Sequence, residues 1–286
     1  MFRRIILASL CAPALARPSP VLVASFSILG DILREVAPVG TDIRVVAGAD
    51  VDAHNFRPRP SQSEALQSAG LAVRNGLGFD TWFDRMTRAA SFRGTMVTAS
   101  DGIAARPAAI VQGHSHGGLD PHAWQDVSLA RHYARRIAAG LEAIGMSHRL
   151  PAYDSRLETL DLWIRDQIAR VPVERRIVLT SHDSFGYFGA AYNVRFLAPQ
   201  GVSTSAEPSA HAMASLIRQV RRQAITAVFM ENVGNPANLR RLAQEAGVQV
   251  LGRLYADALS TPDGPAPNYE AMMRHNLTLM VPAMLG

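Results

Sequence analysis

Three histidines and one aspartate stand where predicted strands and helices meet their loops: His54, His122, His182 and Asp257. Three imidazole nitrogens and one carboxylate oxygen form a ligand set that suits Zn²⁺ in tetrahedral coordination. The four residues are 68, 60 and 75 positions apart, so no local motif links them and only the fold can bring them together. A single histidine after a strand is more often a hydrogen-bonded loop residue. Spacing alone leaves that alternative open for each of them.

Four further residues could support such a site. Glu231 ends a predicted strand, and a carboxylate there could orient a metal-bound imidazole. Asp120 could do the same, or could cap the helix that follows it. His114 and His116 lie in a glycine-rich loop. They either capture metal and pass it inward or belong to a flexible loop in which they have no role.

Short apolar runs alternate with helical patterns along most of the chain. This alternation favours parallel sheets covered by helices. The predicted strands are 21–26, 43–47, 71–75, 95–99, 176–180, 194–197, 227–231 and 248–251, and the predicted helices are 27–36, 61–69, 81–90, 123–144, 150–171, 184–192, 210–223, 236–246 and 269–285.

The alternation occurs twice, on either side of the long helical segment. We therefore predict an α/β chain with two Rossmann-like lobes: residues 17–145 form the N-terminal lobe, 146–171 one long rigid connecting helix, and 172–286 the C-terminal lobe. Ligands of open parallel sheets sit at the carboxyl ends of the strands. This rule places two candidate ligands in each lobe and the metal site in the cleft between the lobes.

The first 16 residues are predicted to be a signal peptide. Arg3 and Arg4 precede a short apolar stretch, and Ala14-Leu15-Ala16 fits the rule for signal-peptide cleavage. Cleavage there removes Cys11, the one cysteine of the chain, and with it any disulfide or thiolate ligand. No later segment has the ~18 consecutive apolar residues of a membrane span. We expect a periplasmic protein.

The positive charge does not indicate a nucleic-acid partner. The 29 basic residues, all arginine, exceed the 24 acidic ones and give a net charge of +5. They are interleaved with acids on predicted helices, and no basic run is longer than two residues. Nucleic-acid binding proteins instead gather basic residues on one face. We predict no nucleic-acid binding.

Several segments resemble the zinc- and manganese-binding solute-binding proteins of ABC transporters, the cluster with a rigid helical backbone between its lobes. The resemblance covers the whole predicted mature chain, and the DPHAW segment is its most specific part. The segments that carry the resemblance are GADVDAHNFRPRPS at 48–61, LAVRNGLG at 71–78, DPHAW at 120–124, TSHDSFGYF at 180–188 and YADAL at 255–259.

The resemblance implies that His54, His122, His182 and Asp257 bind the metal and that the protein is a receptor rather than an enzyme. Zinc receptors of this family carry histidine at the third ligand position and manganese receptors usually carry glutamate, so His182 favours Zn²⁺ as the transported ligand. The implied partner is the membrane permease of a zinc ABC importer. A periplasmic zinc metallochaperone is a further candidate partner, and we expect a monomer.

Two alternatives stay open. One is a manganese or iron receptor of the same family. The other is a secreted zinc hydrolase, whose metal would need an open coordination position for water. Against a hydrolase, the chain contains neither a His-Glu-x-x-His nor a Gly-x-Ser-x-Gly motif. The chain departs from the family in its short loop before the second ligand, where zinc receptors often have a long stretch rich in histidine and acids.

Overall fold

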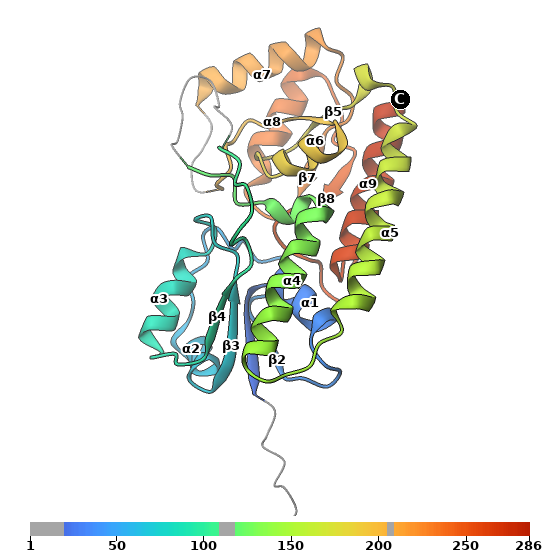
Figure 1. The fold of residues 1–286 in the computed structure, drawn as a ribbon. Helices are drawn as coiled ribbons and strands as arrows, with labels where there is room; N and C mark the ends of the chain where they lie inside the picture. The colour runs from blue at the N-terminus through green and yellow to red at the C-terminus, as the bar shows by residue number, and fades with distance from the viewer. Residues whose placement is uncertain (1–19, 109–117, 205–208) are drawn as a thin grey trace, which may run out of the picture.

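The computed structural model describes residues 20–108, 118–204 and 209–286. Its first lobe is a four-stranded parallel sheet in the order β2-β1-β3-β4 (Figure 1). Its elements are β1 (Val21–Phe26), α1 (Ser27–Val36), β2 (Ile43–Ala47), α2 (Pro60–Gln67), β3 (Ala69–Arg74), α3 (Thr81–Ala89), β4 (Thr95–Thr98), the short 3₁₀ helix η1 (Ala123–Gln125) and α4 (Val127–Ala143).

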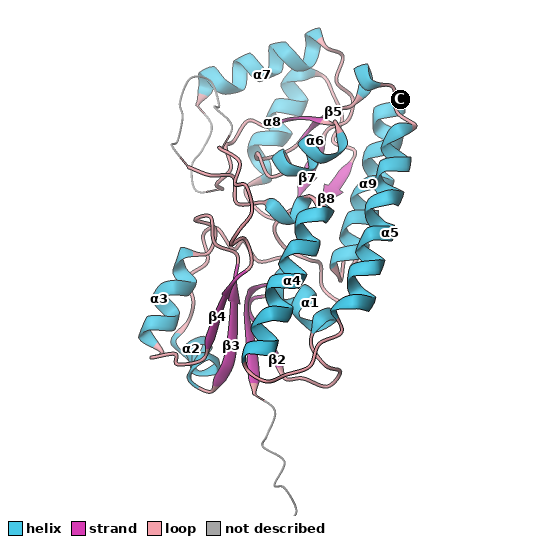
Figure 2. Cartoon of the chain, viewed as in Figure 1, coloured by secondary structure: helices cyan, strands magenta, loops and turns pink. Residues whose placement is uncertain are grey.

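The second lobe contains two parallel pairs of short strands, β5-β6 and β7-β8, which one parallel bridge between Leu179 and Val228 joins. Helices surround these strands (Figure 2). The elements are η2 (Val173–Arg175), β5 (Ile177–Leu179), α6 (Gly186–Tyr192), β6 (Arg195–Leu197), α7 (Ala210–Arg222), β7 (Phe229–Glu231), α8 (Pro236–Ala246) and β8 (Gly252–Leu254). The predicted α/β class with parallel sheets is thus confirmed.

Two long helices lie side by side along both lobes: α5 (Leu150–Ala169) and α9 (Tyr269–Leu285) (Figure 1). The 20 residues of α5 make a rod of about 30 Å. Arg156 of α5 bonds Glu270 of α9 at 2.9 Å and Glu35 of α1 at 2.5 Å. A single guanidinium therefore links both long helices to the first lobe.

A buried sheet and a glycine in α4 together allow this helix to pack closely against the first sheet. Its central strands β1 and β3 are buried along most of their length. Gly140 of α4 lies against Val97 of β4, where an added Cβ would come within 2.3 Å of the valine side chain. The absence of a side chain at Gly140 lets α4 approach the sheet.

The structure corrects two predicted elements that border the site. The strand expected at 248–251 lies at Gly252–Leu254, immediately before the segment of Asp257. The helix expected at 123–144 is broken at Asp126, whose carboxylate accepts the backbone N–H of Ser128 and so begins a new helix there. The predicted signal peptide lies outside the described residues. Among the described helices, none is long and apolar enough to cross a membrane.

A buried carboxyl group holds the start of α9. Asp31 of α1 accepts a hydrogen bond from the backbone N–H of Tyr269 at 2.8 Å, and its side chain is buried. Burial, with nearby Glu35, raises the pKa of Asp31 from 3.8 to about 6. A carboxyl whose pKa is higher in the folded chain contributes stability below pH ~4 and loses it as the pH rises through about 6.

Asp31→Asn keeps an acceptor for the N–H of Tyr269 and removes the cost of ionising a buried carboxyl. We expect the free energy of unfolding of the variant to exceed that of the wild type by up to about 3 kcal/mol at pH 8 and to equal it at pH 4. Thermal melts of the metal-free protein at both pH values measure this. Asp42→Asn, at an exposed carboxylate, serves as the control. An Asp31→Asn variant that is less stable than the wild type at pH 8 would contradict the assignment.

Candidate metal centre

The fold brings together all four predicted ligands. His54 lies in the loop after β2, His122 directly before η1, His182 after β5, and Asp257 after β8. One ligand atom from each lies within 4.8 Å of the others. Residues that are far apart in the sequence therefore form a single cluster at the carboxyl ends of the strands, where ligands of parallel sheets bind.

The carboxylate of Asp257 stands at the middle of the cluster. Its oxygens lie 3.0 Å from Nε2 of His182, 3.3 Å from Nε2 of His54 and 3.4 Å from Nε2 of His122. The Nε2 atoms of His54 and His122 are 3.2 Å apart. Three ring nitrogens and a carboxylate thus converge on one point, which is the geometry of a cation site.

Burial makes this convergence costly without a cation. His122, His182 and Asp257 are at most 1% exposed. The side chain of His54 is 6% exposed. Both oxygens of Asp257 and Nε2 of His182 are buried without a hydrogen-bond partner. Such atoms are rare in folded proteins because losing water without replacement is unfavourable. A metal ion bound to these atoms would satisfy them, so the donor set fits a metal.

Two carboxylates stand behind the imidazoles. Asp120 Oδ1 lies 2.8 Å from Nδ1 of His122, and Glu231 Oε2 lies 2.8 Å from Nδ1 of His182. Glu231 also accepts the backbone N–H groups of Ser181 and His182 and the hydroxyl of Ser184. A carboxylate on Nδ1 directs the free Nε2 towards a metal and raises its basicity. Asp120 and Glu231 thus lie beside the imidazoles that we predicted them to orient, and that role stays a prediction.

The charges of the centre are strongly coupled. Burial lowers the pKa of His54, although Asp257 opposes the shift. Burial also disfavours protonation of His182, but the carboxylates of Glu231 and Asp257 outweigh it and raise its pKa well above the ordinary value. Burial alone would raise the pKa of Asp257, yet His122 and His182 hold it well below its ordinary value. The carboxylate is therefore favoured in its charged form, and the two carboxylates favour the protonated form of His182.

Aromatic rings close the centre on the first-lobe side. The ring of Phe79 meets that of His54 edge-on at 4.5 Å, and the ring of Trp124 lies 5.3 Å from that of His122. Phe26 packs against both Phe79 and Trp124. These rings exclude water and keep the local dielectric low, which strengthens the attraction of the carboxylate for a cation.

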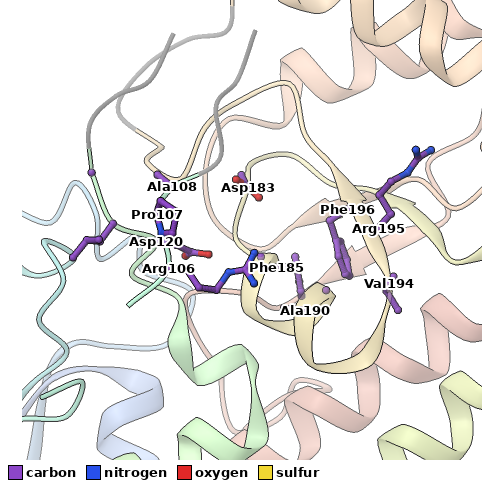
Figure 3. A pocket seen from close by; sticks show the side chains of 14 residues that line it. Arg106, Pro107, Ala108, Asp120, Asp183, Phe185, Ala190, Val194, Arg195 and Phe196 are labelled. Atoms are coloured by element: carbon purple, nitrogen blue, oxygen red, sulfur yellow. The ribbon is translucent and has the colours of Figure 1, made fainter. Parts of the chain in front are cut away.

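A cavity of about 840 Å³ opens beside the centre (Figure 3). Its lining includes Asp120 and Asp183 but none of the four ligands. Burial, and then the charge of Asp120, raise the pKa of Asp183. His114 and His116, the predicted capture residues, lie outside the described residues.

Sequence reasoning missed the residues that hold the ligand segments. Asn75 donates to the carbonyl of Pro121 at 2.9 Å and accepts the hydroxyl of Tyr133, which fixes the segment of His122. Trp124 Nε1 and Gln125 Nε2 donate to the carbonyl of Ala256, at 2.8 and 2.9 Å. The sequence signals were proximity to the candidate ligands and, for Asn75, Trp124 and Ala256, a place in the segments that carry the family resemblance.

Comparison with known proteins identifies the family of this chain. Residues 22–283 match the profile of the protein family described as ZnuA, zinc-uptake complex component A, periplasmic. The chain belongs to this family. Its relatives are metal-binding substrate-binding proteins of ABC transporters, and the predicted resemblance is thereby confirmed.

Curated members of the family are named for different metals. The zinc-binding protein TroA of Treponema pallidum is 29% identical over 282 residues, which cover 95% of this chain and 91% of TroA. The manganese-binding lipoprotein MntA of Halalkalibacterium halodurans is 29% identical, and the alignment covers 91% of this chain and 87% of MntA. The iron-binding protein YfeA of Yersinia pestis is 27% identical, with 90% of this chain and 83% of YfeA covered.

Solved structures show the same two-lobed fold. The periplasmic zinc-binding protein TroA superposes with a TM-score of 0.82 at 26% identity, covering 94% of this chain and all of TroA. A second match is a manganese-bound mutant of a periplasmic metal-binding protein from Candidatus Liberibacter asiaticus. It gives a TM-score of 0.82 at 26% identity, and the superposition covers 93% of this chain and 100% of that protein's chain. The family thus binds metal, while the names of its members span zinc, manganese and iron.

Glu231 provides a test of the support behind His182. Glu231→Gln keeps the size of the side chain and removes its charge, so we expect the pKa of His182 to fall and the affinity for Zn²⁺ to drop about 10–100-fold. NMR titration of the imidazole signals in the metal-free protein and a chelator competition assay measure the two effects.

Glu245→Gln is the matched control, since Glu245 pairs only with arginine on an exposed helix surface in the described contacts. It should change neither value. If Glu231→Gln lowers the melting temperature but leaves both the His182 pKa and the metal affinity unchanged, then Glu231 only stabilises the fold.

Proposed function

We propose that this protein is the periplasmic, high-affinity zinc receptor of an ABC importer, exported with a cleaved signal peptide and delivering Zn²⁺ to a membrane permease. The observation that carries the proposal is the buried cluster of three imidazole nitrogens around one carboxylate, in which Nε2 of His182 and both oxygens of Asp257 have no hydrogen-bond partner. The names of several relatives add support, since they are called ABC transporter substrate-binding lipoproteins.

The donor set favours zinc over manganese or iron. Zn²⁺ accepts four tetrahedral ligands that include imidazoles, whereas Mn²⁺ prefers more oxygen donors and octahedral geometry. Glu231, the nearest further carboxylate to His182, has both oxygens engaged by Ser181, Ser184 and the histidine itself. It is therefore held behind His182 rather than offered as a fifth ligand.

A closed site also argues against a secreted zinc hydrolase. Catalytic zinc keeps one coordination position open for water and has a general base beside it. Here four protein side chains converge on the metal position, and three of the four residues are buried. The arrangement suits holding an ion rather than activating water.

The decisive experiment measures stability and metal choice together. A ligand that binds only the folded chain adds about 4 kcal/mol at 1,000 times its dissociation constant. We expect Zn²⁺ to raise the melting temperature, EDTA to reverse the rise, and an equimolar mixture of Zn²⁺, Mn²⁺ and Fe²⁺ to leave zinc bound, as elemental analysis would show.

His54→Ala should abolish most of this gain in stability. His132→Ala should preserve it, because His132 bonds the backbone carbonyl of Asp101 away from the cluster. If manganese remains bound from the mixture, the receptor assignment stands with a different cargo. If no metal shifts the melting temperature, the receptor proposal is wrong.

Protons should compete with zinc at His182. Because Glu231 and Asp257 raise the pKa of His182 well above its ordinary value, we expect this imidazole to be protonated in the metal-free protein at pH 7, whereas a metal requires it neutral. We expect zinc binding at pH 7 to release about one proton and the affinity to fall as the pH decreases. Calorimetry in buffers of different ionisation enthalpy counts the protons. Zinc binding that releases no proton at pH 7 would show that His182 is neutral or does not bind the ion.

A further inference from the structure

The segment that carries Asp257 follows a second-lobe strand but is held by the first lobe. Immediately after β8 the carbonyl of Ala256 accepts hydrogen bonds from Trp124 and Gln125, both in η1. Two residues past Asp257, the N–H of Leu259 donates to the hydroxyl of Ser27 at 2.9 Å. The ligand therefore lies between two attachments to the first lobe.

The attachment continues beyond Leu259. The carbonyl of Leu259 accepts the N–H of Asp50 at 2.9 Å. At the start of α9, the N–H of Tyr269 donates to Asp31, and its hydroxyl donates to the carbonyl of Trp124 at 2.6 Å. Figure 1 shows α9 starting beside α1, in the lobe that contains β1–β4.

Contacts of this segment with the second lobe are fewer among the described residues. Asn232 donates to the carbonyl of Ala258 at 3.1 Å, but the same amide also donates to Asp50 of the first lobe. Before the segment, β8 pairs with β7 in the second lobe. The chain therefore passes from one lobe to the other between Leu254 and Ala256.

His182 is held in the opposite way. The N–H of Thr180 donates to Leu197, the N–H groups of Ser181 and His182 donate to Glu231, and the N–H of Asp183 donates to Gly201. All of these partners belong to the second lobe. Further on, the hydroxyls of Tyr187 and Tyr192 accept the N–H groups of Arg106 and Val127 of the first lobe at 3.0 and 3.4 Å. Thr204 of the second lobe also bonds Asp52 and Asn55 beside His54. All of these are side-chain contacts that lobe opening can break.

We propose that the centre divides three to one: His54, His122 and Asp257 form a cation site on the first lobe, and His182 is the single ligand that joins and leaves with the second lobe. This inference rests on the proposed metal-binding function and concerns the order in which its ligands act. An arriving ion meets two imidazoles and the buried carboxylate first. His182 then completes the coordination as the lobes close, and its departure opens the route for release.

The test uses Co²⁺ as the probe, because its absorption reports its coordination. Stopped-flow mixing of the protein with Co²⁺ measures the association rate, and mixing of the loaded protein with EDTA measures the release rate. The variants are His54→Ala, Asp257→Ala and His182→Ala. We expect His54→Ala and Asp257→Ala to slow association at least about 10-fold. His182→Ala should leave association within about threefold and accelerate release at least about 10-fold.

Asp257→Asn, which keeps an oxygen donor without the charge, repeats the comparison if Asp257→Ala does not fold. Melting temperatures of the metal-free variants check that each is folded. If the Asp257 variants change only release, as His182→Ala does, or if all variants change the same rates, the three-to-one division is wrong while the metal-binding function stands. If the wild-type protein binds neither Co²⁺ nor Zn²⁺, the proposed function itself is wrong.

Discussion

A buried carboxylate that lacks hydrogen-bond donors constrains everything around it. Asp257 is fully buried, and its carboxylate oxygens contact three imidazoles. An ionised carboxylate in such surroundings is unfavourable unless positive charge balances it. The arrangement is therefore stable only with a cation at its centre, either a metal ion or the proton that His182 holds. The two lobes, the aromatic rings and the supporting carboxylates all serve to keep this charge away from water.

Parallel strands are the reason that residues so far apart can meet. In each lobe the strands point towards the other lobe, and His54 and His182 lie in the loops that leave their carboxyl ends. The long helices α5 and α9 run along both lobes and hold them with these ends facing each other. Strand direction positions the ligands, and the helices set the distance between the two halves of the site.

Much of the fold was predictable from the sequence, because apolar periodicity is a local signal. The four residues that the fold brings together were also named in advance, but strand-end position alone left each of them open and the family resemblance singled them out. What was not predictable depended on long-range hydrogen bonds. Asp257 follows a second-lobe strand, and the sequence assigned it to that lobe, but Trp124, Gln125 and Ser27 bind the segment around it from the first lobe. The shift of β8 to Gly252–Leu254 and the break at Asp126 likewise depend on tertiary contacts and local capping that apolar periodicity does not report.

The supporting carboxylates explain how the centre can open without leaving a bare charge in either lobe. Glu231 contacts His182 and bonds its backbone, so histidine and carboxylate belong to the same lobe. Asp120 is bonded to His122 in the other lobe, where Asp257 also faces His54. Each half of the centre therefore keeps an imidazole beside each carboxylate of the site when the halves separate.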